Sequence, residues 1–194
     1  MNWLAHLRLA PDEPLLRLGN LRGDFVRGID LASLHPVLQR GVHQHRAVDA
    51  FVDAHPLVRA SRERLDAPFR RFAGVLVDVF YDHYLARDWT RLGDGSRLDA
   101  FAATVHGELR DHLDLLPERL QRAVPWMQDE RWLVGYAEVD GIDAVLRRMA
   151  RRLSRETPLG AGARQLRAHY DALGEDFAAF WPELVAFADR ELRA

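Results

Sequence analysis

The chain has 194 residues, of which 48% are hydrophobic, and a formal net charge of −2 at pH 7, so it can bury one sizeable core. This charge balance argues against a globally basic protein that binds nucleic acid, though not against a local basic patch. The absence of cysteine excludes disulfides, thiolate-bound zinc and cysteine nucleophiles, so any metal must be held by nitrogen and oxygen atoms.

The first residues do not have the pattern of a secretory signal, because His6 and Arg8 interrupt the apolar positions there. No stretch approaches the roughly 18 consecutive apolar residues that a membrane span requires. We therefore expect a cytoplasmic protein that binds neither membranes nor nucleic acid.

The sequence predicts an all-α protein. Alanine, leucine and arginine favour helices and are frequent, and no long alternation of β-branched residues occurs. Proline and glycine set the boundaries between helices. The expected helices span residues 2–9, 15–26, 36–54, 56–65, 68–87, 98–115, 117–127, 129–136, 142–153 and 163 to near the carboxyl terminus. Because we find no repeat or linker, we expect a single compact helical domain over residues 1–194.

The helix predicted over residues 36–54 carries His45, Asp49 and Asp53 at intervals of four. Residues four apart share one face of a helix, so these side chains form a stripe bordered by valines. A histidine and an aspartate one turn apart can bind the same divalent cation. The same spacing is also typical of a solvated face with intrahelical ion pairs, and the spacing alone leaves both interpretations open.

Two further carboxylates, Asp78 and Asp82, lie within the apolar stretch VLVDVFYDHYL. An unpaired carboxylate in such surroundings is costly, so each needs a cation or a basic partner. An ion pair with arginine and a metal site would both meet this need. His6 and Asp24 are less specific signals, because a lone histidine often packs in a core and a Gly-Asp pair can end a helix.

Taken in order and spacing, four segments resemble the acyl carrier protein phosphodiesterase family: MNWLAHLRLA, GNLRGDFVRG, GVHQHRAVDAFVDAHP and DVFYDHYLARDW. The segment RWLVGYAEVDGIDAVLRRMARR extends the resemblance, which covers most of the chain. It implies a helical fold related to the HD phosphohydrolases. It also implies an enzyme of lipid metabolism and fatty acid biosynthesis, a hydrolase that cleaves the phosphodiester between 4′-phosphopantetheine and a serine of acyl carrier protein.

The resemblance further implies a bound divalent metal, Mn²⁺ first and Mg²⁺ as the alternative. No His-Asp dipeptide occurs in the chain, and Asp82-His83 has the reverse order, so the ligands of ordinary HD enzymes cannot be transferred directly. We expect the ligands to come from separate helices that converge. Our candidate metal ligands are His6, Asp24, His45, Asp49 and Asp82.

Other residues are candidates for the chemistry at the phosphate. Arg27 or Arg46 would bind its non-bridging oxygens, because a guanidinium group matches phosphate geometry. His43 or His83 would protonate the leaving serine alkoxide, because histidine exchanges protons near neutral pH. His83 could alternatively support the metal.

A run of arginines near residue 150 predicts a docking surface for the acidic carrier protein, with Arg148 and Arg152 at its centre. Such a run can equally be a solvated helix face. Two other functions remain open from the sequence: an HD-like phosphohydrolase of a nucleotide or other small phosphoester, and a non-catalytic helical module that binds carrier protein.

Overall fold

The computed structural model describes residues 1–10, 12–26, 28, 30–129 and 131–193. These residues form thirteen α-helices, five short 3-10 helices and no strand, which confirms the all-α prediction. The helices of the first half are α1 (Trp3–Leu9), α2 (Pro14–Arg22), α3 (Pro36–Ala54), α4 (Pro56–Glu63), α5 (Ala73–Arg87) and α6 (Trp89–Leu92). Those of the second half are α7 (Leu98–Asp111), α8 (Glu118–Gln121), α9 (Val124–Asp129), α10 (Trp132–Gly135), α11 (Val139–Arg151), α12 (Ala163–Ala168) and α13 (Tyr170–Glu191). The 3-10 helices are η1 (Gly23–Phe25), η2 (Leu31–Ser33), η3 (Phe69–Phe72), η4 (Leu113–Leu115) and η5 (Pro158–Ala161).

Two predicted helices are each divided into two α-helices, and those predicted over residues 15–26, 68–87 and 98–115 are each part α-helix and part 3-10 helix. The helix expected over residues 117–127 becomes α8 and α9, because Pro125 lacks an N–H and suits the first turn of a new helix. The final helix is interrupted at His169, whose backbone leaves the helical region, so α12 and α13 are separate. Pro182 does not end α13.

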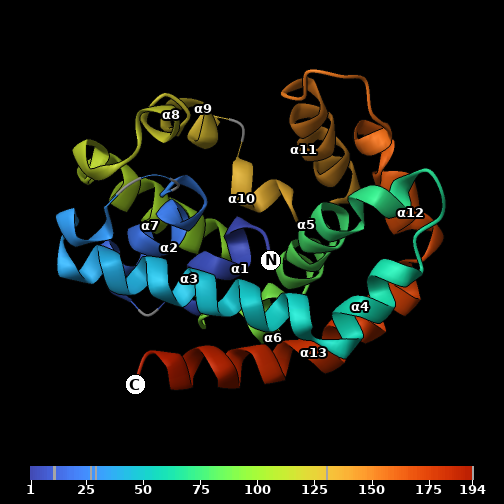
Figure 1. Cartoon of the computed structure of the whole chain (residues 1–194), viewed down its shortest axis with the longest axis horizontal. Helices are drawn as coiled ribbons and strands as arrows, with labels where there is room; N and C mark the ends of the chain where they lie inside the picture. The colour runs from blue at the N-terminus through green and yellow to red at the C-terminus, as the bar shows by residue number, and fades with distance from the viewer. Residues whose placement is uncertain (11, 27, 29, 130, 194) are drawn as a thin grey trace.

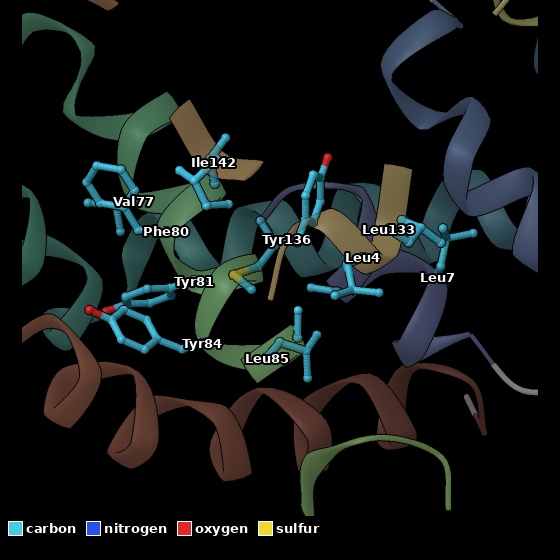
Figure 2. Packing of buried hydrophobic residues seen from close by; sticks show 14 of the residues in the cluster. Leu4, Leu7, Val77, Phe80, Tyr81, Tyr84, Leu85, Leu133, Tyr136 and Ile142 are labelled. Atoms are coloured by element: carbon cyan, nitrogen blue, oxygen red, sulfur yellow. The ribbon is translucent and has the colours of Figure 1, made fainter. Parts of the chain in front are cut away.

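Helix α5 lies at the centre of the fold. Buried apolar residues lie on all sides of it, as expected for a helix surrounded by other helices, although Asp82 and His83 are buried among them. Figure 2 shows Phe80 and Tyr84 of α5 in the hydrophobic core together with Leu4 of α1, Leu133 of α10 and Ile142 of α11. This core therefore joins elements from both halves of the chain.

The other long helices surround this centre. Helices α3 and α13 contact each other and cross the molecule along its long axis, while α7 to α11 lie on the other side of α1 (Figure 1). Among the described residues, no helix combines the length and the apolar character that crossing a membrane would require.

Asp82, which we expected to bind metal, instead holds the start of α1. Its Oδ2 accepts a hydrogen bond from the backbone N–H of Leu4 at 2.8 Å, and its Oδ1 accepts one from Ala5 at 3.2 Å. These N–H groups belong to the first turn, where no intrahelical acceptor exists, and the side chain of Asn2 does not cap them. Burial raises the pKa of Asp82 to about 7, although the two hydrogen bonds oppose this. Both of its oxygens are thus used to fix α1 against α5.

We expect the substitution Asp82→Ala to lower the free energy of unfolding by about 2–3 kcal/mol, because it leaves two buried N–H groups without acceptors. Urea denaturation would measure this. Asp53→Ala is a matched control, since Asp53 is 69% exposed and pairs with Arg62 at 2.7 Å. A surface ion pair of this kind is worth less than about 1 kcal/mol. Equal losses in the two variants would contradict the capping role of Asp82.

Candidate metal centre

Three segments bring together four side chains, which we call the His–Asp cluster: His6 from α1, Asp24 from η1, and His45 and Asp49 from α3. Nε2 of His6 lies 3.1 Å from Oδ1 of Asp49, and Nε2 of His45 lies 3.1 Å from Oδ2 of the same carboxylate. Nε2 of His45 also lies 3.5 Å from Oδ1 of Asp24. Asp49 therefore bridges the two imidazoles, and His45 lies between the two carboxylates.

The two imidazole rings pack face to face. The ring centres of His6 and His45 are 4.0 Å apart, with an angle of 24° between their planes. Their Nδ1 atoms are buried and have no hydrogen-bond partner within the described part of the chain. The polar contacts of both rings therefore run through Nε2, toward Asp49.

The charges of the cluster depend on one another. Burial lowers the pKa of His6, against its hydrogen bond to Asp49. Burial would also lower the pKa of His45, but Asp24 and Asp49 outweigh it and raise that pKa to about 9. In turn His45 and His6 hold the pKa of Asp49 well below its usual range despite its burial. The ionised carboxylates thus attract positive charge to the space between them.

The α-amino group of Met1 adds a positive charge beside the cluster. The α-amino nitrogen of Met1 lies 3.5 Å from Oδ1 of Asp49 and 3.4 Å from Oδ1 of Asp78. Asp78 therefore has a cationic partner, as its apolar surroundings led us to expect.

The His–Asp cluster fits a divalent cation. One donor atom from each of His6, His45 and Asp49 can be chosen so that all lie within 4.8 Å of one another. Imidazole nitrogen and carboxylate oxygen are the donors that Mn²⁺ accepts, and Mg²⁺ prefers the oxygens. The imidazole side chains are nearly fully buried, whereas Asp24 is 50% and Asp49 40% exposed. A cation held here would therefore face the protein on one side and a substrate on the other.

Gly23 allows η1 to lie directly against His45. A Cβ at this position would be 2.2 Å from Cγ and Cδ2 of the imidazole ring, far inside contact distance. The next residue, Asp24, is held from its other side by Trp3, whose Nε1 donates a hydrogen bond to Oδ2 at 3.1 Å. The position of Asp24 therefore depends on both neighbours.

Two cavities adjoin Asp24, and we call them together the cleft. They have volumes of about 170 and 160 Å³, and both are lined by Trp3, Asp24, Trp126 and Arg152. The larger cavity is further lined by Asn2, Trp132, Tyr136, Val145, Arg148 and Met149. The smaller one is further lined by Phe25, Arg119, Leu120 and Ala123. Of the four members of the His–Asp cluster, Asp24 lines this space, whose other walls are largely aromatic and basic.

The structure brings Arg148 and Arg152, which we predicted to contact a partner protein, to the wall of this cleft. The guanidinium carbon of Arg148 lies 4.6 Å from the ring centre of Trp126. By contrast, Arg147 faces away and pairs with Asp143 at 2.7 Å. Arg148 and Arg152 therefore line the cleft and Arg147 does not, while their contact with a partner protein stays a prediction.

His83 is not brought to the His–Asp cluster. Its Nδ1 lies 2.9 Å from the carbonyl oxygen of Tyr136, and its Nε2 lies 2.9 Å from the hydroxyl of Tyr170. Burial lowers its pKa, which favours a neutral ring that donates from Nδ1 to the carbonyl and accepts the hydroxyl proton at Nε2. In this arrangement His83 ties α5 to the residues that follow α10 and to α13.

His43 and Arg46 also lie apart from the cluster, although both are on α3. Both residues are exposed, and neither lines the cleft. Their positions two residues before and one residue after His45 turn them to other faces of the helix. Arg27 lies outside the described residues.

Our sequence reasoning missed Trp3 and Trp126. Trp3 precedes His6 by three positions and so shares a helix face with it, which was an available signal. Trp126 offered no such signal, because it reaches the cleft through the packing of α9 against distant residues.

Comparisons with known proteins show which proteins the whole chain is similar to. A family model described as acyl carrier protein phosphodiesterase matches residues 1–184. A protein of that name from Yersinia enterocolitica is 37% identical over 188 residues, which are 97% of this chain and 97% of that protein. One from Salmonella dublin is 38% identical over 191 residues, 98% of this chain and 99% of that protein. No solved structure matches the chain, so the relation to HD phosphohydrolases stays a prediction.

We expect Gly23→Ala to weaken Mn²⁺ binding at least about tenfold, because the added methyl group must displace the His45 ring. Isothermal titration calorimetry with Mn²⁺ would measure this. Gly107→Ala is the matched control, since a Cβ there meets nothing within 4 Å. Unchanged affinity in Gly23→Ala, with a fold as stable as that of the control, would contradict the close contact.

Proposed function

The chain belongs to the acyl carrier protein phosphodiesterase family, and from this premise we propose its reaction. It hydrolyses the phosphodiester that joins 4′-phosphopantetheine to a serine of holo-acyl carrier protein, releasing apo-carrier protein and 4′-phosphopantetheine. The observation that supports this most directly is the His–Asp cluster, one member of which, Asp24, also lines a cleft with aromatic and basic walls. The reaction takes place in the cytoplasm, which fits a chain without cysteine.

In this proposal His6, His45 and Asp49 bind Mn²⁺, with Asp24 as the fourth ligand. The bound cation supplies charge that stabilises phosphoryl oxygens, and it lowers the pKa of a water molecule. The chain's own residues provide the positioning. Asp49 sets the orientation of both imidazoles, and Trp3 directs one oxygen of Asp24 away from His45.

Family membership favours this reaction over the two alternatives left open by the sequence. A binding module without catalysis would release no product from holo-carrier protein. A phosphohydrolase of small phosphoesters would act on those in preference to the carrier protein. Mass spectrometry of holo-carrier protein after incubation with this protein and Mn²⁺ distinguishes the proposed reaction from both alternatives, because loss of the prosthetic group changes the mass of the carrier protein. A panel of small phosphoesters tested in parallel separates the two alternatives from each other.

We expect Asp49→Ala to lower the rate of 4′-phosphopantetheine release at least about 100-fold, because it removes one ligand and frees both imidazoles. Asp53→Ala serves as the control: Asp53 is one turn further along α3 and pairs with Arg62 on the surface. We expect this variant to keep the wild-type rate. If Asp49→Ala kept the wild-type rate and the wild-type metal content, the assignment of the metal site would be wrong.

Removal of metal provides an independent check. We expect dialysis against a chelator to abolish product release, and addition of Mn²⁺ to restore it, because the carboxylates and imidazoles of the cluster offer no substitute for the cation's charge. Circular dichroism after dialysis would show whether the helices persist. A chelated protein that stays folded and retains full activity would contradict metal dependence.

A further inference from the structure

We propose that the cleft binds the 4′-phosphopantetheine group itself, with Arg148 and Arg152 contacting its phosphate and the aromatic wall around Trp126 and Trp132 packing along its chain. This inference rests on the proposed function and identifies the residues that select its substrate.

The phosphate belongs at the place where the two cavities adjoin. Trp3, Asp24, Trp126 and Arg152 line both cavities, so they surround this place. Asp24 connects it to the metal ligands, because Oδ1 lies 3.5 Å from Nε2 of His45. A phosphodiester bound here would lie beside Asp24, our proposed fourth metal ligand, and would have a cavity on each side of it.

Three arginines line the cleft. Arg148 lines the larger cavity, Arg119 lines the smaller one, and Arg152 lines both. Arg148 lies in the last turn of α11, and Arg152, four residues later, is the residue that caps this helix. Burial lowers the pKa of Arg152, and the charges of Arg119 and Arg148 lower it further. These three guanidinium groups give the walls of the cleft a positive character that attracts an anion. A phosphate is such an anion, and guanidinium groups bind it through paired hydrogen bonds.

The larger cavity suits the chain that follows the phosphate. Trp132, Val145 and Met149 give it an apolar wall, while Asn2 and Tyr136 add polar groups. Pantetheine has the matching pattern, with two methyl groups near the phosphate and amides beyond them. The volume of about 170 Å³ is below the roughly 300 Å³ at which pockets enclose drug-sized ligands, so the cavity holds the phosphate end rather than the whole arm.

The smaller cavity then faces the serine and the carrier protein. It is lined by Arg119 and Arg152 together with Phe25 and Leu120. A basic rim on this side matches the acidic surface expected of the carrier protein. The two cavities thus give the two sides of the phosphodiester different surroundings.

The test compares two free ligands, 4′-phosphopantetheine and pantetheine, by calorimetry with the Mn²⁺-loaded protein. We expect the phosphorylated ligand to bind more tightly. Arg148→Ala and Arg152→Ala should each lower the affinity for 4′-phosphopantetheine about tenfold to 100-fold. Each should leave the affinity for pantetheine within about twofold of the wild-type value. Val145→Trp, whose larger side chain fills part of the larger cavity, should lower the affinity for both ligands by similar factors.

Arg190→Ala is the matched control, because it removes the same charge from the last turn of α13, far from α11 (Figure 1). We expect it to bind both ligands as the wild type does. Arg152→Lys should recover part of the lost affinity, which separates a loss of charge from a loss of fold.

Hydrolysis of holo-carrier protein, followed in parallel, separates this inference from the proposed function. If the wild type releases product but the arginine variants keep full affinity for 4′-phosphopantetheine, the assignment of the cleft is overturned and the proposed function stands. A higher KM for holo-carrier protein with unchanged affinity for the free ligand would also overturn it and would assign Arg148 and Arg152 to docking. If the wild type releases no product, the proposed function fails, and the ligand affinities still decide what the cleft binds.

Discussion

The close approach of α2 to α3 is the constraint on which the site depends. A Cβ added at Gly19 would lie 2.4 Å from the carbonyl oxygen of Leu38, and one added at Gly41 would lie 2.3 Å from that of Leu16. A larger residue at either position would push the helices apart. Because η1 follows α2 directly, the distance between these helices also fixes where Asp24 stands.

Three kinds of interaction hold the four donors of the His–Asp cluster. The register of α3 sets His45 and Asp49 one turn apart, so no other part of the protein is needed to align them. His6 depends on the cap that Asp82 provides to α1. Asp24 depends on the packing of backbone against an imidazole ring. The cluster therefore combines local geometry with contacts between segments that are distant in sequence.

This difference explains how much of the protein could be predicted. Helix type and the pairing of His45 with Asp49 follow from composition and spacing, which are local properties. The role of Asp82 could not be predicted, because a buried carboxylate is satisfied equally by a metal or by backbone N–H groups, and its partner Leu4 is 78 positions away. The cleft could not be predicted from the sequence for the same reason. Its walls come from α9 and α11, and only the packing of the fold brings them to Trp3.

The placement of these walls has a consequence for how such an enzyme can diverge. All four members of the His–Asp cluster lie in the first 49 residues, whereas most of the cleft wall comes from residues 119–152. Replacements in α9 or α11 can therefore reshape what enters the cleft without touching a metal donor. Trp3 and Asp24 belong both to the surroundings of the metal site and to the wall of the cleft. A lineage that acquires a new substrate would therefore change residues 119–152 while keeping these two side chains.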